Sequence, residues 1–221
     1  MKASELLKGL QYSVICGDED IEIKEIYNDS RKVGAQGLFF CIVGAKFDGH
    51  EYIKDVTEKG AVCLIVQKDV NPVPGVLIVK VESTRYAMGI VSSNFYGNPS
   101  SKLTVIGITG TKGKTTTTYM IREMLMSAGH KTGLIGTIEI MDGKEVIPAN
   151  NTTPESMIVH KKLKDMLDNG HFLTKTCEIR QRSLKSVFPR ERPWMTCFRK
   201  PLRLSVRQIN EFLAWSPTAY S

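Results

Sequence analysis

The sequence predicts an α/β protein of two parts: a small N-terminal α/β domain and the start of a domain with a mostly parallel sheet. Apolar segments of strand length alternate with amphipathic helical segments over residues 1–168, the order that places helices on the faces of a parallel sheet. Residues 97–101, Gly-Asn-Pro-Ser-Ser, have the composition of a linker. We therefore expect a domain boundary there.

The elements of the first part follow from hydrophobic periodicity. Residues 21–26 alternate apolar and charged side chains, as in a strand with one solvent-facing side. Residues 4–10 and 50–59 have the period of short helices, with Ser4 as the N-cap of the first and Gly60 after the second. Further strands are expected at 38–43, 61–66 and 76–81, and a helix at 83–96.

The second part is expected to begin with a strand at 103–108 and a helix at 115–128 that ends at Gly129. A strand at 131–140 should form a hairpin with residues 145–147 through the turn at Asp142 and Gly143. Thr153 is the expected N-cap, and Pro154 the first residue, of a helix that continues to residue 168.

The turn between the 103–108 strand and its helix carries the clearest chemical signal. Residues 107–116 read G-x-x-G-x-x-G-K-T-T, so a glycine-rich turn enters a helix whose first N–H groups and dipole favour an anion. Lys114 adds a full charge for phosphates, and the Thr115 hydroxyl can bind Mg²⁺. The standard P-loop spacing needs glycine where Ile108 stands, but a turn that bound nothing would leave Lys114 uncompensated. We predict a site for nucleotide phosphates.

Composition excludes several classes of protein. The hydrophobic content of 42% and charged content of 24% are typical of globular proteins. The longest apolar runs, at 38–43 and 61–66, are too short to span a bilayer, and the N-terminus lacks the apolar core of a secretory signal. The five cysteines form no close pair, and the histidines have no metal-ligand spacing. We expect a cytoplasmic protein with reduced thiols.

Residues 171–221 differ in composition from the rest of the chain. They contain no glycine or aspartate and use 7 Arg to 3 Lys, whereas residues 1–170 hold all 18 glycines and use 17 Lys to 3 Arg. The net charge of +7 arises entirely in this tail. Such a change favours a shifted reading frame or a truncation over a basic extension of the fold. The tail contains no recognisable nucleic-acid module, so no specific nucleic-acid partner is expected.

Three segments together resemble the Mur ligase family, and within it the MurE type. The turn is similar to the family's T-G-T-x-G-K-T-T element, with Lys112 where asparagine is more usual. Asp-Ser-Arg at 29–31, Gly-Leu-Phe at 37–39 and Gly44 are similar to the D-S-R…G-x-L-F…G signature of the N-terminal domain. Thr-Thr-Pro-Glu-Ser at 152–156 is similar to the T-T-P-E-S element of many Gram-positive members.

The resemblance implies a UDP-muramoyl-substrate domain at 1–97, the beginning of an ATP-binding domain at 102–170, and an atypical tail at 171–221. It assigns Lys114 to catalysis, and Thr115 and Glu178 to Mg²⁺; Glu178 stands where the family has the glutamate of E-V-S-S, although Arg180 and Gln181 replace the serines. It assigns ATP to Gly110, Thr111, Lys112, Gly113, Lys114, Thr115 and Thr116. It assigns the sugar nucleotide to Asn28, Ser30, Ala45, Lys46 and Phe47, and the muramoyl peptide to Asn151, Thr152 and Thr153.

The implied reaction adds meso-diaminopimelate or L-lysine to UDP-N-acetylmuramoyl-L-alanyl-D-glutamate in peptidoglycan synthesis. In the family ATP phosphorylates the D-glutamate side chain, and the diamino acid then attacks the acyl phosphate. The expected partners are these small molecules, with no membrane, and the chain is expected to be a monomer. The S-P-D-H element, the carbamylated lysine and the D-N-P-R element have no counterpart, so an inactive N-terminal fragment is expected.

Two alternatives remain open at this point. In the first, the chain is a non-catalytic module in which residues 1–97 bind a UDP-sugar. In the second, it is a P-loop kinase or GTPase, which explains the turn but gives the Asp-Ser-Arg and Thr-Thr-Pro-Glu-Ser segments no role.

Overall fold

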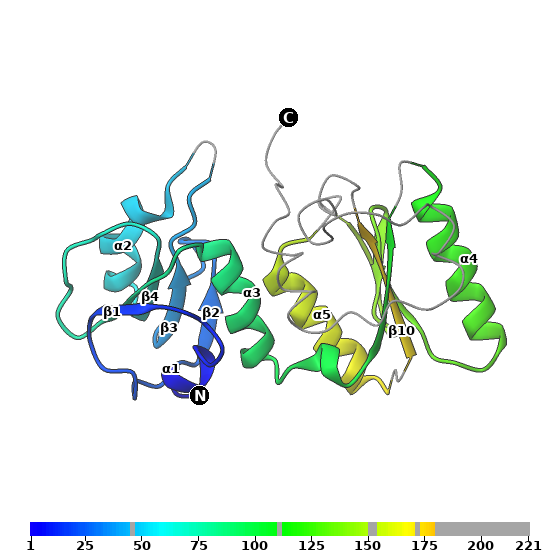
Figure 1. Ribbon diagram of the computed structural model, residues 1–221, viewed down its shortest axis with the longest axis horizontal. Coiled ribbons are helices and arrows are strands. Elements are labelled where there is room, and N and C mark those ends of the chain that lie inside the picture. The colour runs from blue at the N-terminus through cyan, green and yellow to red at the C-terminus, as the bar shows by residue number, and fades with distance from the viewer. Residues whose placement is uncertain (45–46, 110–111, 150–153, 171–172, 180–221) are drawn as a thin grey trace. The chain divides into compact units, whose positions relative to one another are not determined.

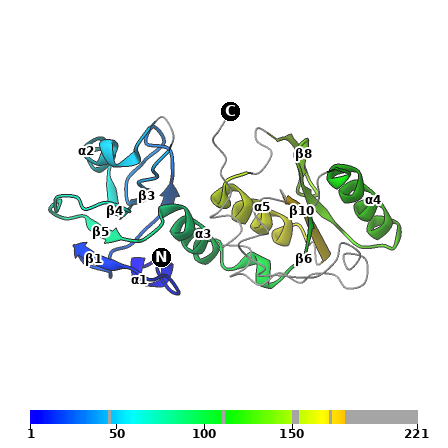
Figure 2. The same ribbon diagram turned by 45° about the horizontal axis from the view of Figure 1, so that its top comes forward.

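The computed structural model of this 221-residue chain describes residues 1–44, 47–109, 112–149, 154–170 and 173–179. The chain divides into two compact units, one that contains residues 1–95 and one that begins at Tyr96. Each unit has its own five-stranded sheet with helices packed against it (Figures 1 and 2). The predicted α/β fold is therefore confirmed.

The sheet of the first unit has the strand order β1-β5-β4-β3-β2. Strands β2, β3, β4 and β5 pair in parallel, and β1 pairs antiparallel with β5 at one edge. The bounds are β1 (Ser13–Cys16), β2 (Glu25–Tyr27), β3 (Gly37–Phe40), β4 (Ala61–Val66) and β5 (Leu77–Lys80).

Helices cover both faces of this sheet because its strands carry apolar residues on both sides. Val56 of α2 belongs to a buried cluster with Leu64 and Ile78, whereas the alternate residues Ile65 and Val79, also buried, face the opposite side. On that side α3 contacts α1 and β4. The bounds are α1 (Ala3–Leu6), the 3₁₀ helix η1 (Gly49–Tyr52), α2 (Ile53–Glu58) and α3 (Thr84–Phe95).

The sheet of the second unit has the strand order β6-β10-β7-β8-β9, with β10 parallel to both of its neighbours and β8 and β9 antiparallel. Helices α4 and α5 lie on opposite faces of the sheet (Figures 1 and 2). The bounds are η2 (Pro99–Ser101), β6 (Thr104–Thr109), α4 (Lys114–Ser127), β7 (Gly133–Ile135), β8 (Glu139–Met141), β9 (Val146–Pro148), α5 (Ser156–Asp168) and β10 (Leu173–Ile179).

The strand expected at 131–140 is two strands. β7 ends at Ile135 and β8 begins at Glu139, and the N–H of Gly136 donates to the carbonyl of Glu139 at 3.0 Å to close the turn between them. The prediction of one strand was wrong because apolar side chains continue through the turn, where Ile138 is 60% exposed. The hairpin predicted with residues 145–147 is confirmed as β8 and β9 (Val146–Pro148).

Two helix starts also differ from the prediction. α1 begins after Lys2, not at Ser4, and α5 has Glu155 as its N-cap, with Pro154 before the helix rather than in its first turn. Thr153, the predicted cap, lies outside the described residues. The capping preference of Ser and Thr is worth about 1 kcal/mol, which tertiary packing readily overrides. The short edge strand β1 was not predicted at all.

The second unit continues beyond residue 170, where the composition changes. β10 (Leu173–Ile179) lies between β6 and β7 in the middle of the described sheet. The change in composition at residue 170 therefore does not mark the end of the described sheet, because glycine content and Lys/Arg usage do not detect a strand of seven residues.

The expectations of reduced thiols and of no membrane-spanning segment concern two features of the described residues: the burial of the cysteines and the length of the helices. Cys41 and Cys63 are buried free thiols, and burial raises the pKa of Cys41 to about 12, so this thiol is protonated and unreactive. Among the described helices, none has both the length and the apolar character needed to cross a bilayer.

A buried ion pair joins the β8–β9 turn to α5. Asp142 is 4% exposed, and its Oδ2 accepts from Lys162 Nζ at 2.7 Å. Its Oδ1 accepts from the N–H groups of Lys144 and Glu145 at 3.1 and 3.0 Å. Burial alone would raise the pKa of Asp142, but these hydrogen bonds lower it from 3.8 to about 2. The charged carboxylate therefore stabilises the fold.

We expect Asp142→Asn to lower the free energy of unfolding at neutral pH by about 2 kcal/mol, the value of a shift of this size. The pKa of Asp142 is lower in the folded state, about 2 against 3.8. Its contribution is thus complete above about pH 4 and is lost as the pH falls through 2. Thermal unfolding followed by circular dichroism between pH 2 and 7 measures both effects.

The matched control is Asp20→Asn, which removes an ion pair with Lys2 whose two side chains are 67% and 52% exposed. We expect that variant to unfold within about 0.5 kcal/mol of the parent at every pH. Equal stability of Asp142→Asn and the parent at pH 7 would contradict the role given to the buried pair.

Candidate nucleotide-binding sites

A pocket of about 580 Å³ opens in the first unit at the carboxyl ends of β2 and β3. The segment 28–32 directly follows β2, and Phe40 ends β3. Parallel strands direct their carboxyl ends to one edge, which is where α/β proteins bind ligands. The lining residues are Asn28, Asp29, Ser30, Arg31, Lys32, Phe39, Phe40, Ile42, Phe47, Gly49 and Tyr52.

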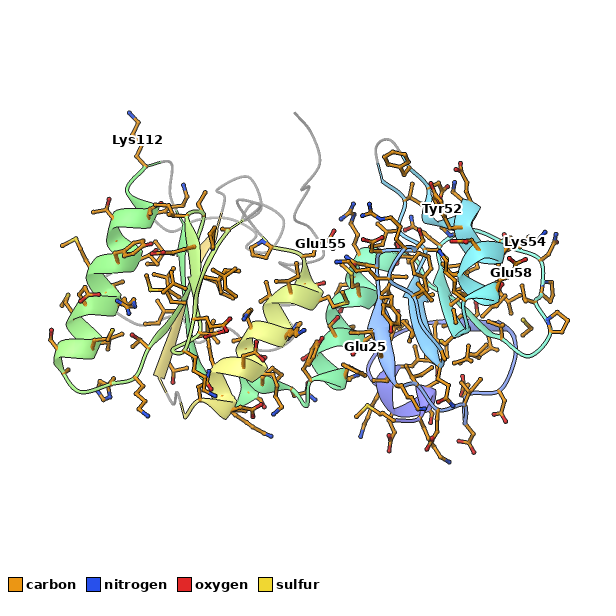
Figure 3. The ribbon with its side chains drawn as sticks, turned by 180° about the vertical axis from the view of Figure 1, so that it is seen from behind. Glu25, Tyr52, Lys54, Glu58, Lys112 and Glu155 are labelled. Carbon is orange, nitrogen blue, oxygen red and sulfur yellow. The ribbon has the colours of Figure 1, made fainter. Side chains whose placement is uncertain are left out.

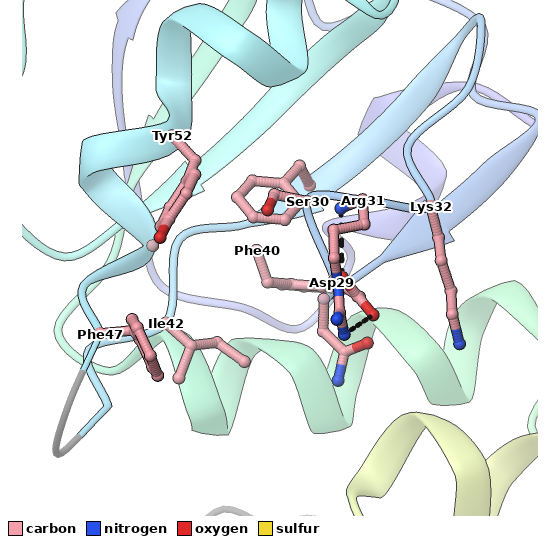
Figure 4. A pocket seen from close by; sticks show the side chains of 11 residues that line it. Asp29, Ser30, Arg31, Lys32, Phe40, Ile42, Phe47 and Tyr52 are labelled. Atoms are coloured by element: carbon pink, nitrogen blue, oxygen red, sulfur yellow. Dashed lines mark hydrogen bonds and ion pairs between the residues drawn. The ribbon is translucent and has the colours of Figure 1, made fainter.

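The two sides of this pocket differ in chemistry. In Figure 4, Tyr52, Phe47 and Ile42 lie on one side, and Arg31 and Lys32 lie on the other. Phe47 is 70% exposed, so its ring is accessible to a ligand in the pocket. An apolar, aromatic side suits a flat base, and a cationic side suits phosphate.

An ion pair orients the cationic side. Arg31 Nε and Nη2 donate to the two oxygens of Asp29, both at 2.9 Å. These hydrogen bonds from Arg31 are the largest cause that lowers the pKa of Asp29 to about 2. Lys59, the residue that follows α2, also holds this loop, since its Nζ donates to the carbonyl of Ser30 at 3.0 Å. The loop is therefore held by one ion pair within it and by one hydrogen bond from outside.

The second unit contains the strand, turn and helix that the sequence predicts for phosphate binding. Gly113 has φ +78°, and α4 begins at the next residue, Lys114. The first turn of α4 contains no acidic side chain that would repel an anion. Lys112 is exposed and projects from the turn above α4 (Figure 3). The geometry therefore meets the requirements of an anion site at a helix N-terminus.

A second pocket, of about 530 Å³, runs along α4 from this helix start. Its lining includes Thr115, Tyr119, Met124 and Ile138. The hydroxyl of Tyr119 donates to Glu139, and burial together with this carboxylate raises the pKa of Tyr119 to about 12. Met124 lines this pocket and is 70% exposed.

The strand β10 brings Glu178 to the same end of the sheet. In the parallel register Glu178 lies opposite Ile108, near the carboxyl end of β6, where the phosphate turn begins. Of the predicted magnesium residues, Thr115 therefore lies in the first turn of α4, directly after the turn, and Glu178 lies on β10, beside the strand that precedes the turn.

The predicted site residues fall into three groups. Asn28, Ser30 and Phe47 lie together in the first pocket. Gly113 and Lys114 lie at the turn and helix start, and Thr115 and Thr116 line the second pocket as well. The predicted residues Ala45, Lys46, Gly110, Thr111, Asn151, Thr152 and Thr153 lie outside the described residues.

Sequence reasoning missed several residues of the first pocket. Tyr52 lies in the predicted helix at 50–59 and was given no role in a site; it ends η1 and contacts both the buried cluster and the pocket. Arg31 was quoted as part of a motif but given no role. The only sequence signal for Lys32 was its place beside Arg31, at the end of a polar cluster.

Fold and geometry define the class of this protein. It is an α/β protein of two units, in which the second unit has a P-loop type of strand, turn and helix.

Comparison with known protein families agrees with that class. Residues 22–96 match the Mur ligase family catalytic domain, and residues 108–184 match the Mur ligase middle domain. The chain belongs to the Mur ligase family, as the resemblance of its motifs indicated.

Curated relatives extend the similarity across both units. The chain is 48% identical over 167 residues to UDP-N-acetylmuramoyl-L-alanyl-D-glutamate--2,6-diaminopimelate ligase 1 of Clostridium acetobutylicum. It is 48% identical over 170 residues to the ligase of that name from Clostridium perfringens. The matches cover 76% and 77% of this chain but 35% of each relative, so the chain spans about a third of their length.

Solved structures show the same fold. A structure of UDP-N-acetylmuramoyl-L-alanyl-D-glutamate--2,6-diaminopimelate ligase matches 84% of this chain and 37% of its own, with TM-score 0.65 and 19% identity. MurF from Acinetobacter baumannii matches 81% of this chain and 35% of its own, with TM-score 0.56 and 24% identity.

We expect Gly113→Ala to destabilise the start of α4 by about 1 kcal/mol, because a left-handed φ of +78° is costly for a residue with a Cβ. The matched control is Gly113→Asn, which tolerates this conformation better and should lose less. Thermal unfolding followed by circular dichroism compares the two variants. An alanine variant as stable as the parent would show that the turn does not need this conformation.

Proposed function

We propose that the chain is the N-terminal part of an ATP-dependent amide ligase that extends the peptide of UDP-N-acetylmuramoyl-L-alanyl-D-glutamate in peptidoglycan synthesis. The first unit holds the sugar nucleotide and the second holds ATP. The observation that carries this proposal is the presence of two features in one chain. The first unit has a pocket with an aromatic side and a cationic side, and the second unit has a helix that begins with lysine and threonine directly after Gly113. The names of the curated relatives favour diaminopimelate as the added amino acid.

In the first unit, the uracil ring would lie on the aromatic side of the pocket, against Phe47 and Tyr52. The diphosphate would lie toward Arg31 and Lys32, with Asn28 and Ser30 supplying polar contacts. The opposite chemistry of the two pocket sides supports this orientation. A base and a diphosphate are joined through ribose, so a ligand of this length matches a pocket of about 580 Å³.

In the second unit, the ATP phosphates would lie at the start of α4, over the backbone of Gly113 and against Lys114. Thr115, in the first turn of α4, and Glu178, on β10 beside β6, would supply oxygen donors, the type that Mg²⁺ prefers. Bound Mg²⁺ would offset negative charge on the phosphates. Lys114 would neutralise charge on the transferred phosphoryl group.

The chemistry needs an activated carboxylate, because a carboxylate ion is a poor electrophile. Its oxygen attacks the γ-phosphorus of ATP, and the bond to ADP breaks. The amine of the diamino acid then attacks the acyl carbon, an amide bond forms, phosphate leaves, and the amine loses a proton. The residues of this chain contribute to the first step by holding the phosphates and the sugar nucleotide.

The 221-residue chain is proposed to bind both nucleotides without completing the reaction. The test is to incubate the chain with ATP, Mg²⁺, UDP-N-acetylmuramoyl-L-alanyl-D-glutamate and meso-diaminopimelate, and to measure ADP and tripeptide by chromatography. We expect neither product. Tripeptide formation at 1 s⁻¹ or faster, within the usual range of about 1–10³ s⁻¹ for enzymes, would show that the chain is catalytically complete.

A second candidate function is the non-catalytic binding module. The separation of the chain into two units, with the sugar-nucleotide pocket wholly in the first, favours it as the alternative. Calorimetry separates the two: sugar-nucleotide binding without any ATP binding would support the module.

We expect Lys114→Ala to lower the affinity for Mg·ATP at least tenfold, because a charge-assisted contact to phosphate is worth about 1.5–3 kcal/mol. The matched control is Lys131→Ala, an exposed lysine beyond the end of α4, which should bind like the parent. Isothermal titration calorimetry measures both. Equal affinity of Lys114→Ala and the parent would place the phosphates elsewhere.

A further inference from the structure

His50 occupies a buried position next to the sugar-nucleotide pocket, although it does not line it. Its side chain is 8% exposed, and its Nε2 accepts the backbone N–H groups of Gln67 and Lys68 at 3.0 and 3.3 Å. Because Nε2 accepts, the ring proton is on Nδ1, which donates to Asp48 Oδ1 at 2.6 Å. His50 therefore connects Asp48 to the end of β4.

Asp48 is held from three directions. Besides the His50 ring, it accepts the backbone N–H of His50 at 3.0 Å and the ammonium group of Lys68. Partial burial alone would raise the pKa of Asp48, but the hydrogen bonds from Lys68 and His50 bring it well below its usual range. Asp48 is thus a charged carboxylate that fixes the first turn of η1.

The residue before Asp48 is Phe47, whose aromatic ring forms part of the pocket wall. Phe47 is 70% exposed, so packing does little to fix it. Backbone contacts hold it instead: Gly44 N–H donates to the Phe47 carbonyl at 2.9 Å, and Val43 and Asp48 form an antiparallel bridge. A Cβ on Gly49 would lie 2.7 Å from the Ile42 nitrogen. The backbone at Gly49 therefore passes close to the segment that follows β3.

We propose that His50 is a positioning residue for the sugar-nucleotide pocket: through Asp48 it holds Phe47 where the base binds. This inference rests on the proposed function of the first unit. His50 touches no ligand itself. The two ring nitrogens have different partners. Nδ1 donates to Asp48, and Nε2 accepts a backbone N–H that follows β4 and so fixes the ring.

The consequence is a loss of affinity that depends on Phe47. His50→Ala should weaken binding of UDP-N-acetylmuramoyl-L-alanyl-D-glutamate by about five- to tenfold, the value of one aromatic contact. His50→Gln should show the same loss, because its amide oxygen can accept the N–H groups of Gln67 and Lys68 but the Nδ1 donor to Asp48 is gone.

The experiment is a double-mutant cycle on the full chain, measured by isothermal titration calorimetry with that sugar nucleotide. The four proteins are the parent, His50→Ala, Phe47→Ala and the double variant. If His50 acts through Phe47, the effect of His50→Ala should disappear in the Phe47→Ala background. Val56→Ala, which removes buried apolar volume from α2 in the same unit, is the control for destabilisation and should keep the parent affinity.

The outcomes are distinct. Absence of binding to the parent chain would overturn the proposed function, and with it this inference. Parent affinity in His50→Ala, or in His50→Gln if the alanine variant does not fold, would overturn the inference alone. An equal loss from His50→Ala with and without Phe47 would do the same, because it would show that His50 does not act through that side chain.

Discussion

The parallel pairing of β10 holds the described sheet of the second unit together. β6, which leads into the phosphate turn, and β7, which begins the antiparallel β7-β8-β9 segment, do not pair with each other; both pair with β10. Parallel pairing brings together segments far apart in sequence, so its hydrogen bonds form only after a long loop has closed. The phosphate turn therefore depends on a strand that follows it by more than 60 residues.

The sequence predicts the fold well where one local signal decides it. The buried run Ala61–Val66 was assigned its observed bounds because an apolar run of that length between turns is a buried strand. The glycine-rich turn was predicted to bind phosphate because glycine, lysine and threonine have direct chemical meaning at a helix start. The composition of residues 171–221 could not indicate β10, because an average over 51 residues conceals seven residues with an ordinary strand pattern.

The candidate site was less predictable because its residues meet through tertiary structure. Asn28 and Ser30 were expected to meet Phe47, and they share a pocket with it. Tyr52 was not expected there, since helical periodicity reports which side faces a core and not which ring reaches a cavity. The position of the His50 ring depends on hydrogen bonds from backbone N–H groups that lie 17 and 18 residues further along the chain. No pattern of residue types can reveal a backbone donor.

The ion pair between Asp29 and Arg31 affects how the first pocket selects its ligand. The guanidinium of Arg31 has five N–H donors, and its two hydrogen bonds to Asp29 use two of them. Asp29 also offsets the positive charge of Arg31, so an anion gains less free energy here than it would from an unpaired cation. Under the proposed function, a small anion such as inorganic phosphate, which makes no contact with the aromatic side, should therefore compete weakly. Discrimination against small anions would then come from the charge balance of the pocket before the ligand binds.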